Sequence, residues 1–172
     1  MATKQSSLLS GRAIQTLAGV PTNVVNDGGR LHTKNGIVAL VVADLDANDI
    51  VMLFGIPTGA VILELWIAND DLEGATPIST FNLGIYKKAN DTSENGDENV
   101  YATLVTQLQA ASAFVDLAFE ARGIELAGQQ VYKDAGDTVD PDSEYFVGLQ
   151  IVTSMTNKVA GDIAFKCVYA VD

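Results

Sequence analysis

The stretch "DIVMLFGIPTGAVILELWIANDD", residues 49–71, decides the fold. Residues 50–63 carry no charge, which raises the question of whether the chain crosses a membrane here. A transmembrane helix needs about 20 apolar residues, whereas Pro57 and Gly59 interrupt this run between strand-forming residues. The stretch therefore predicts two buried β-strands joined by a turn, either as a hairpin or as a consecutive pair, and no membrane partner.

Composition describes a globular chain. Of 172 residues, 48% are hydrophobic and 19% charged, which suits one domain with a core of its own. Lys and Arg number 10 against 22 Asp and Glu, giving a net charge of −12. Binding to a phosphate backbone requires an excess of bases. We therefore expect no nucleic-acid partner.

The N-terminal region differs from the remainder. Residues 1–30 show no sustained hydrophobic period and contain no apolar region typical of a secretory signal, which predicts an arm on a cytosolically made domain of residues 31–172. The arm is basic, with Lys4, Arg12 and Arg30 against Asp27. We expect its apolar and basic side chains to bind a partner, the candidates being Leu8, Leu9, Arg12, Ile14 and Leu17.

From residue 31 onward the dominant period is two, as in strands with one buried face. In "AVILELWIAN" the alternation predicts Val61, Leu63, Leu65 and Ile67 as core. The same pattern predicts half-buried strands in "TFNLGIYK", "EYFVGLQIV" and the closing "GDIAFKCVYAV". "GIVALVVAD" and "DIVMLFGI" are apolar on both faces, which predicts cover by a second sheet or a neighbouring subunit.

Helical spacing is limited to two places. Tyr101, Leu104, Val105 and Leu108 predict a short helix within 99–109, and "GQQVYKDAG" predicts a single turn ending at Gly136. Seven or eight short strands with turn clusters between them indicate an all-β antiparallel sandwich or barrel. We expect a β-sandwich of jelly-roll type with one short helix and an extended N-terminal arm.

Residues able to carry chemistry are sparse. His32 is the only histidine and Cys167 the only cysteine, so no second His or Cys exists to complete a zinc site. Cys167 also falls on the core face of its strand, where a reactive thiolate is disfavoured. The 91–102 loop follows a calcium-loop pattern until its twelfth position, where Ala102 replaces the required Glu. The sequence therefore predicts no catalytic residue, no cofactor and no bound metal, and thus no enzyme.

Trp66 is the only tryptophan, and it lies on the face opposite Leu65. Two interpretations remain open from the sequence. Trp66 packs under a loop of its own chain, or it anchors an interface, where aromatic residues are enriched. It therefore joins the arm residues as a candidate for partner binding.

The order of segments from about residue 40 to 172 resembles small virion structural proteins of tailed bacteriophages. The segments are "DANDIVMLFGIPTGAVILELWIANDDL", "TFNLGIY", an acidic loop, the predicted short helix, "DPDSEYFVGLQI" and "AGDIAFKCVYAV". The resemblance implies a jelly-roll cement or decoration protein, located as a trimer on the capsid surface and bound to the major capsid protein. Two alternatives remain: a tail, neck or fibre component, and a carbohydrate-binding jelly-roll module using Trp66, Tyr86, Tyr101 or Tyr132.

Overall fold

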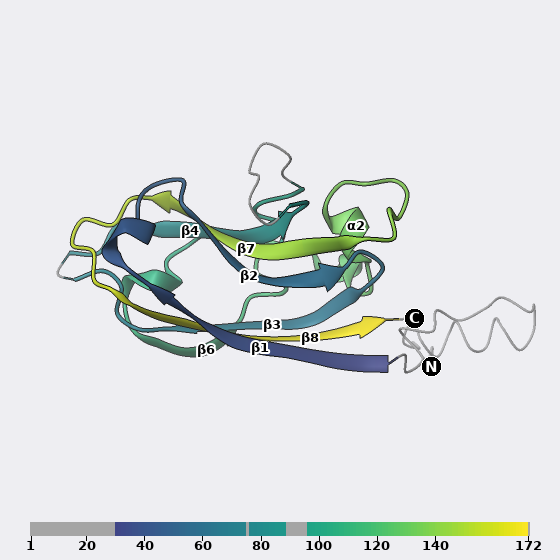
Figure 1. The fold of residues 1–172 in the computed structure, drawn as a ribbon, viewed down its shortest axis with the longest axis horizontal. Coiled ribbons are helices and arrows are strands. Elements are labelled where there is room, and N and C mark those ends of the chain that lie inside the picture. Colours follow the sequence, from purple (N-terminus) through teal and green to yellow (C-terminus); the bar gives the residue numbers. More distant parts are fainter. Residues whose placement is uncertain (1–29, 75, 89–95, 172) are drawn as a thin grey trace, which may run out of the picture.

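Two antiparallel sheets packed face to face form the molecule (Figure 1). The computed structural model describes residues 30–74, 76–88 and 96–171. One sheet has the order β1-β8-β3-β6, with bounds Arg30–Leu40, Gly161–Val171, Val61–Asn69 and Ser112–Asp116. The other has the order β2-β7-β4-β5, with bounds Ile50–Pro57, Glu144–Thr153, Thr80–Tyr86 and Ala102–Val105.

This strand order is that of a jelly roll, in which consecutive strands alternate between the two sheets for much of the chain. The helical segments are short: η1 Val42–Asp44, η3 Gln107–Gln109, η4 Ile124–Leu126 and α2 Val131–Asp134. The predicted fold class is therefore confirmed. The arm residues Leu8, Leu9, Arg12, Ile14 and Leu17, and residues 91–95 of the 91–102 loop, lie outside the described residues.

The 49–71 stretch forms β2 and β3, as two consecutive strands. The turn between them is closed by a hydrogen bond from the Ala60 N–H to the Pro57 carbonyl, 3.0 Å long. Because β2 and β3 belong to different sheets, the turn takes the chain from one layer to the other and is not a hairpin. Among the described residues, no helix has the length and apolar character that a membrane span requires.

The core lies between the sheets and follows the predicted alternation in most strands. In β8, the predicted side chains of Ile163, Phe165, Cys167 and Tyr169 all point inward. In β3 the prediction is correct for Leu65 and Ile67, whereas a register shift between Ile62 and Glu64 changes the faces before them. Ile62 therefore joins the core cluster between the sheets. Val61 is fully buried as predicted but lies outside that cluster, and Leu63 is only half-buried.

The helix predicted within 99–109 is wrong. Residues Ala102–Val105 form strand β5, in which Val105 pairs with Phe81 and Ala102 with Leu83, and only the single turn η3 follows. Pairing with the edge of the sheet determines the structure here, whatever the local helical spacing. The apolar residues have helical spacing only by coincidence, because a short strand is followed by a single turn. The second prediction is confirmed, since α2 is one turn and Gly136 has the positive φ of +82° that ends such turns.

Strand β1 shows a second difference. The predicted strand "GIVALVVAD" ends at Leu40, and the chain continues as η1, whose Asp44 carboxylate accepts a hydrogen bond from the Val41 N–H. Only one face of β1 is covered by the second sheet. The side chain of Ile37, on the other face, is 69% exposed.

Candidate interaction surface

The outer face of the β1-β8-β3-β6 sheet, called the bare face below, carries a row of apolar side chains that crosses the strands. Ile37 pairs with Ala164, and Ala164 pairs with Ala68. Phe114 of β6 continues the row at the sheet edge and is 49% exposed. Two small residues in the central strands thus lie between two large ones in the edge strands.

This arrangement of sizes creates a hollow of about 620 Å³. Ile37 and Phe114 contribute to it from the two edge strands, and Ala164 and Lys166 of β8 belong to its lining. A volume in this range accommodates several apolar side chains of a partner or a small ligand. Large apolar groups left open to solvent in this way are typical of interaction sites.

Trp66 lies next to the hollow, in register with Lys166 and Asp116. Its indole N–H donates a hydrogen bond to the Glu64 carboxylate at 2.9 Å, and the Lys166 ammonium lies 4.0 Å from the same carboxylate. The ring is half-buried. Trp66 is therefore held in place on the bare face, and its role in partner binding remains a prediction.

The outer face of the β2-β7-β4-β5 sheet, called the covered face below, is different. β4 was predicted to be half-buried, yet from Phe81 to Tyr86 every residue is buried. A Cβ atom on Gly84 would lie 2.1 Å from the Asp97 carbonyl oxygen, and one on Gly148 would lie 2.8 Å from the Tyr86 ring. The chain's own loop and the Tyr86 side chain therefore cover this face.

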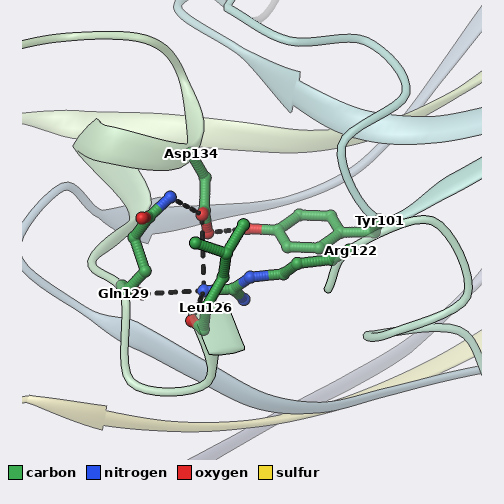
Figure 2. Close-up of polar contacts among 5 residues, drawn as sticks. All are labelled: Tyr101, Arg122, Leu126, Gln129 and Asp134. Carbon is green, nitrogen blue, oxygen red and sulfur yellow. Dashed lines mark hydrogen bonds and ion pairs between the residues drawn. The ribbon is translucent and has the colours of Figure 1, made fainter. Parts of the chain in front are cut away.

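A buried polar network anchors the segment that follows β6 (Figure 2). The Arg122 side chain is fully buried and lies 3.3 Å from the Asp134 carboxylate. It donates hydrogen bonds to the carbonyls of Leu126 and Gln129, at 2.8 and 3.1 Å. Tyr101 and Gln129 donate to the two oxygens of Asp134.

This network is suited to holding the chain and not to proton transfer. Desolvation, which exceeds the opposing effect of the Arg122 charge, raises the pKa of Asp134. Desolvation together with the Asp134 charge also raises the pKa of Tyr101 well above its ordinary value. Both groups are buried from solvent. The sequence reasoning missed this network, because no sequence pattern shows that Tyr101 packs beside the 122–134 segment or that the Arg122 and Asp134 side chains turn inward.

The residues considered earlier for chemistry occupy ordinary structural positions. His32 is exposed and stacks on Tyr169, with ring centroids 5.3 Å apart. Cys167 is buried as predicted, and burial raises the pKa of its thiol to about 12, which disfavours a nucleophilic thiolate. Within the described ranges, no group of three or more His, Cys, Asp or Glu side chains is placed to hold a metal ion.

The aromatic residues considered for sugar stacking are mostly inaccessible. Tyr86 and Tyr101 are completely buried, and Tyr132 packs partly against the core. Trp66 is half-buried beside Glu64. Sugar-binding sites usually present several exposed rings, so the arrangement disfavours the carbohydrate-binding alternative.

Comparison with known proteins places this fold among chains of phage capsid structures. One similar chain belongs to the capsid of Ralstonia phage GP4, with 22% identity, a TM-score of 0.65 and coverage of 84% of this chain and 86% of that one. Another belongs to the cyanophage Pam1 capsid asymmetric unit, with 20% identity, a TM-score of 0.57 and coverage of 84% and 87%. No protein-family profile and no curated protein sequence matches the chain.

Proposed function

We propose that this protein is a non-enzymatic structural component of a bacteriophage virion, and specifically a decoration or cement protein on the head. One observation carries the proposal: the jelly roll matches chains of two phage capsid structures over more than four-fifths of each chain. The bare face supports it, because a shell-stabilising protein works by burying apolar surface against its neighbours.

The arm is the proposed attachment element. Residues 1–30 hold Lys4, Arg12 and Arg30, whereas most of the acids in the chain lie in the domain. A basic arm on an acidic body suits an arrangement in which the arm binds the major capsid protein and the domain faces solvent, where its charge opposes particle aggregation. The protein is proposed to act as a homotrimer, because the decoration proteins that the sequence resembles are trimers, and a trimer is one of the closed symmetric assemblies that soluble oligomers form.

Particle binding tests this proposal directly. Heads lacking the protein are mixed with either the full chain or a variant without residues 2–28, and occupancy is measured by cryo-electron microscopy. We expect the full chain to cover the head and the truncated chain to fold normally but not attach. A matched control neutralises the acids of the 91–98 loop and leaves attachment unchanged. Full occupancy by the truncated chain would show that the domain makes the contact.

The same particles distinguish the second candidate. A tail, neck or fibre component would appear in the particle map at the tail or at its junction with the head. We expect density on the head surface with local three-fold symmetry, and light scattering of the free protein should give three times the 18.2 kDa chain mass. A stable monomer would contradict the proposed trimer.

A further inference from the structure

The bare face exposes apolar side chains, and covering them would lower the free energy of the free protein in water. Ile37 and Phe114 are large and exposed, and the hollow between them is open. On the other sheet, the corresponding outer face is covered at Gly84 and Tyr86 by a loop of the same chain. The question is which occupant fits the bare face.

Charge argues against a second copy binding face to face. Glu64, Asp116 and Asp162 lie on or beside the bare face, with Lys166 as the base among them, and Asp70 lines the adjoining depression. Two such faces would bring carboxylates together, which costs free energy. A segment that binds this face should therefore carry apolar and basic side chains and be narrow enough to fit in the hollow.

The N-terminal segment of the chain has this chemistry. Residues 1–29 contain Leu8, Leu9, Ile14 and Leu17, with Lys4 and Arg12 against Asp27. We propose that residues 1–29 bind the bare face of their own chain, with apolar side chains in the hollow between Ile37 and Phe114. The contact goes beyond the proposed capsid role, because it covers the face in the free protein and is released when the arm binds the shell.

The segment is long enough and enters from the correct sheet. It joins the domain at Arg30, the first residue of β1, and the hollow begins three residues later at Thr33. Ile37 is about 23 Å along β1 from Arg30, at roughly 3.3 Å per residue, whereas 29 extended residues reach about 95 Å. The sequence "NDGG" at 26–29 is rich in residues that favour a change of direction. Tethering gives the arm a millimolar effective concentration at the face.

Two measurements on the free protein test the contact. Trypsin cleaves after Arg12, so docking should slow that cleavage roughly tenfold relative to a variant with an impaired face. Trp66, the only tryptophan, lies beside the hollow and reports on its hydration. Removing residues 2–28 should shift its emission to longer wavelength, and adding a synthetic peptide of residues 1–29 should reverse the shift.

Matched variants separate docking from folding. Ala164→Glu places a charge in the hollow, and Phe114→Ser removes one of its sides; both should restore fast cleavage after Arg12 while circular dichroism stays unchanged. Val139→Glu, at an exposed apolar residue outside the bare face, should leave cleavage slow. Equal cleavage rates in the wild type and both face variants, or an unchanged Trp66 emission after truncation, would overturn the proposal.

Dilution identifies the chain that supplies the arm. Protection of Arg12 that does not change between high and low protein concentration supports binding within one chain. Protection lost on dilution would assign the arm to a neighbouring copy and overturn the intrachain contact. Because these experiments use no phage particles, their failure would leave the proposed capsid function to be judged by its own particle-binding test.

Discussion

The two outer faces of this sandwich are built from similar strands, but one is covered by the chain itself and the other is open. On the covered face, glycines at 84 and 148 make room for a loop backbone and for the Tyr86 ring, so apolar residues of β4 are buried on both sides. On the bare face, Ala164 lines the hollow and Ala68 lines the depression beside it, but no described segment of the chain fills either of them.

The difference shows how small residues in a central strand indicate a contact. A residue without a large side chain lowers the sheet surface locally, and a neighbouring segment then approaches closely. Where that segment belongs to the same domain, its burial stabilises the fold. Where it does not, the depression is available for binding. We therefore expect substitutions on the covered face to change stability and equivalent ones on the bare face to change binding.

Substitution of the core that both sheets share should have the largest effect. Leu65→Asp places a carboxylate between the sheets at a fully buried position and should abolish folding, at a cost above about 4 kcal/mol. Glu64→Gln, on the adjacent residue but the opposite face, should cost less than about 1 kcal/mol. Chemical denaturation of both variants checks this. Equal losses of stability would show that the assigned strand faces are wrong.

Substitution in the buried polar network of Arg122 and Asp134 should have the second largest effect. Arg122→Met removes the ion-pair partner of the Asp134 carboxylate and the side-chain donor to the carbonyls of Leu126 and Gln129, and breaking a buried ion pair from one side costs about 3–5 kcal/mol. Lys133→Met, at an exposed position one residue from Asp134, is the control. Urea unfolding midpoints measure the difference. If Arg122→Met combined with Asp134→Asn is no more stable than the single Arg122→Met variant, the uncompensated charge is not the cause.

A direct comparison of the two faces should give the third effect. Gly84→Ala forces a methyl group against the Asp97 backbone and should destabilise by about 2–3 kcal/mol. Ala164→Val adds two methyl groups to an open hollow and should change stability by no more than about 0.5 kcal/mol. Thermal unfolding of the pair measures this contrast. A larger cost for Ala164→Val than for Gly84→Ala would mean that the hollow is filled by the domain itself.

Acid should weaken the loops at the end of the covered sheet by a smaller amount. Despite desolvation, hydrogen bonds from Lys87 and Tyr145 hold the pKa of Asp137 below its ordinary value. A lowered folded-state pKa gives stability that is present above the unfolded value of about 3.8 and is lost as the pH falls through the folded value.

Asp137→Asn should therefore cost about 1 kcal/mol at pH 7, the size of a partly solvated charged hydrogen bond. The difference from the wild type should shrink as the pH falls below 3.8 and through the lowered folded-state pKa, because the wild-type carboxyl then becomes protonated in the folded protein as well. Urea unfolding at pH 7 and at a series of acidic pH values measures it. A difference that stays constant with pH would show that the charge of Asp137 contributes nothing.

Alternation in the sequence was enough to predict an antiparallel sandwich or barrel and the inward faces of β7 and β8, and the resemblance to phage proteins favoured the jelly roll among these folds. Local patterns failed where a tertiary contact overrides them. The bulge in β3 reverses the faces near Ile62, and the pairing of β5 with β4 replaces the helix expected around Leu104. The hollow could not be predicted, because it depends on the positions of strands that are distant in the sequence: its lining residues Ile37, Phe114 and Ala164 lie on three different strands.

Removal of an aromatic ring should change the folding stability least on the bare face, whereas the same change on the covered face should cost much more. Phe114→Ser deletes a ring that is half exposed, so little packing is lost and stability should change by less than about 1 kcal/mol. Tyr86→Ser deletes a completely buried ring that packs over Gly148 and should cost about 3–5 kcal/mol. Denaturant unfolding is best measured on both variants without residues 2–28, since the arm then contributes nothing to either. A cost for Phe114→Ser near that of Tyr86→Ser in this background would mean that Phe114 supports the fold, and that the bare face is part of the domain core and not a binding surface.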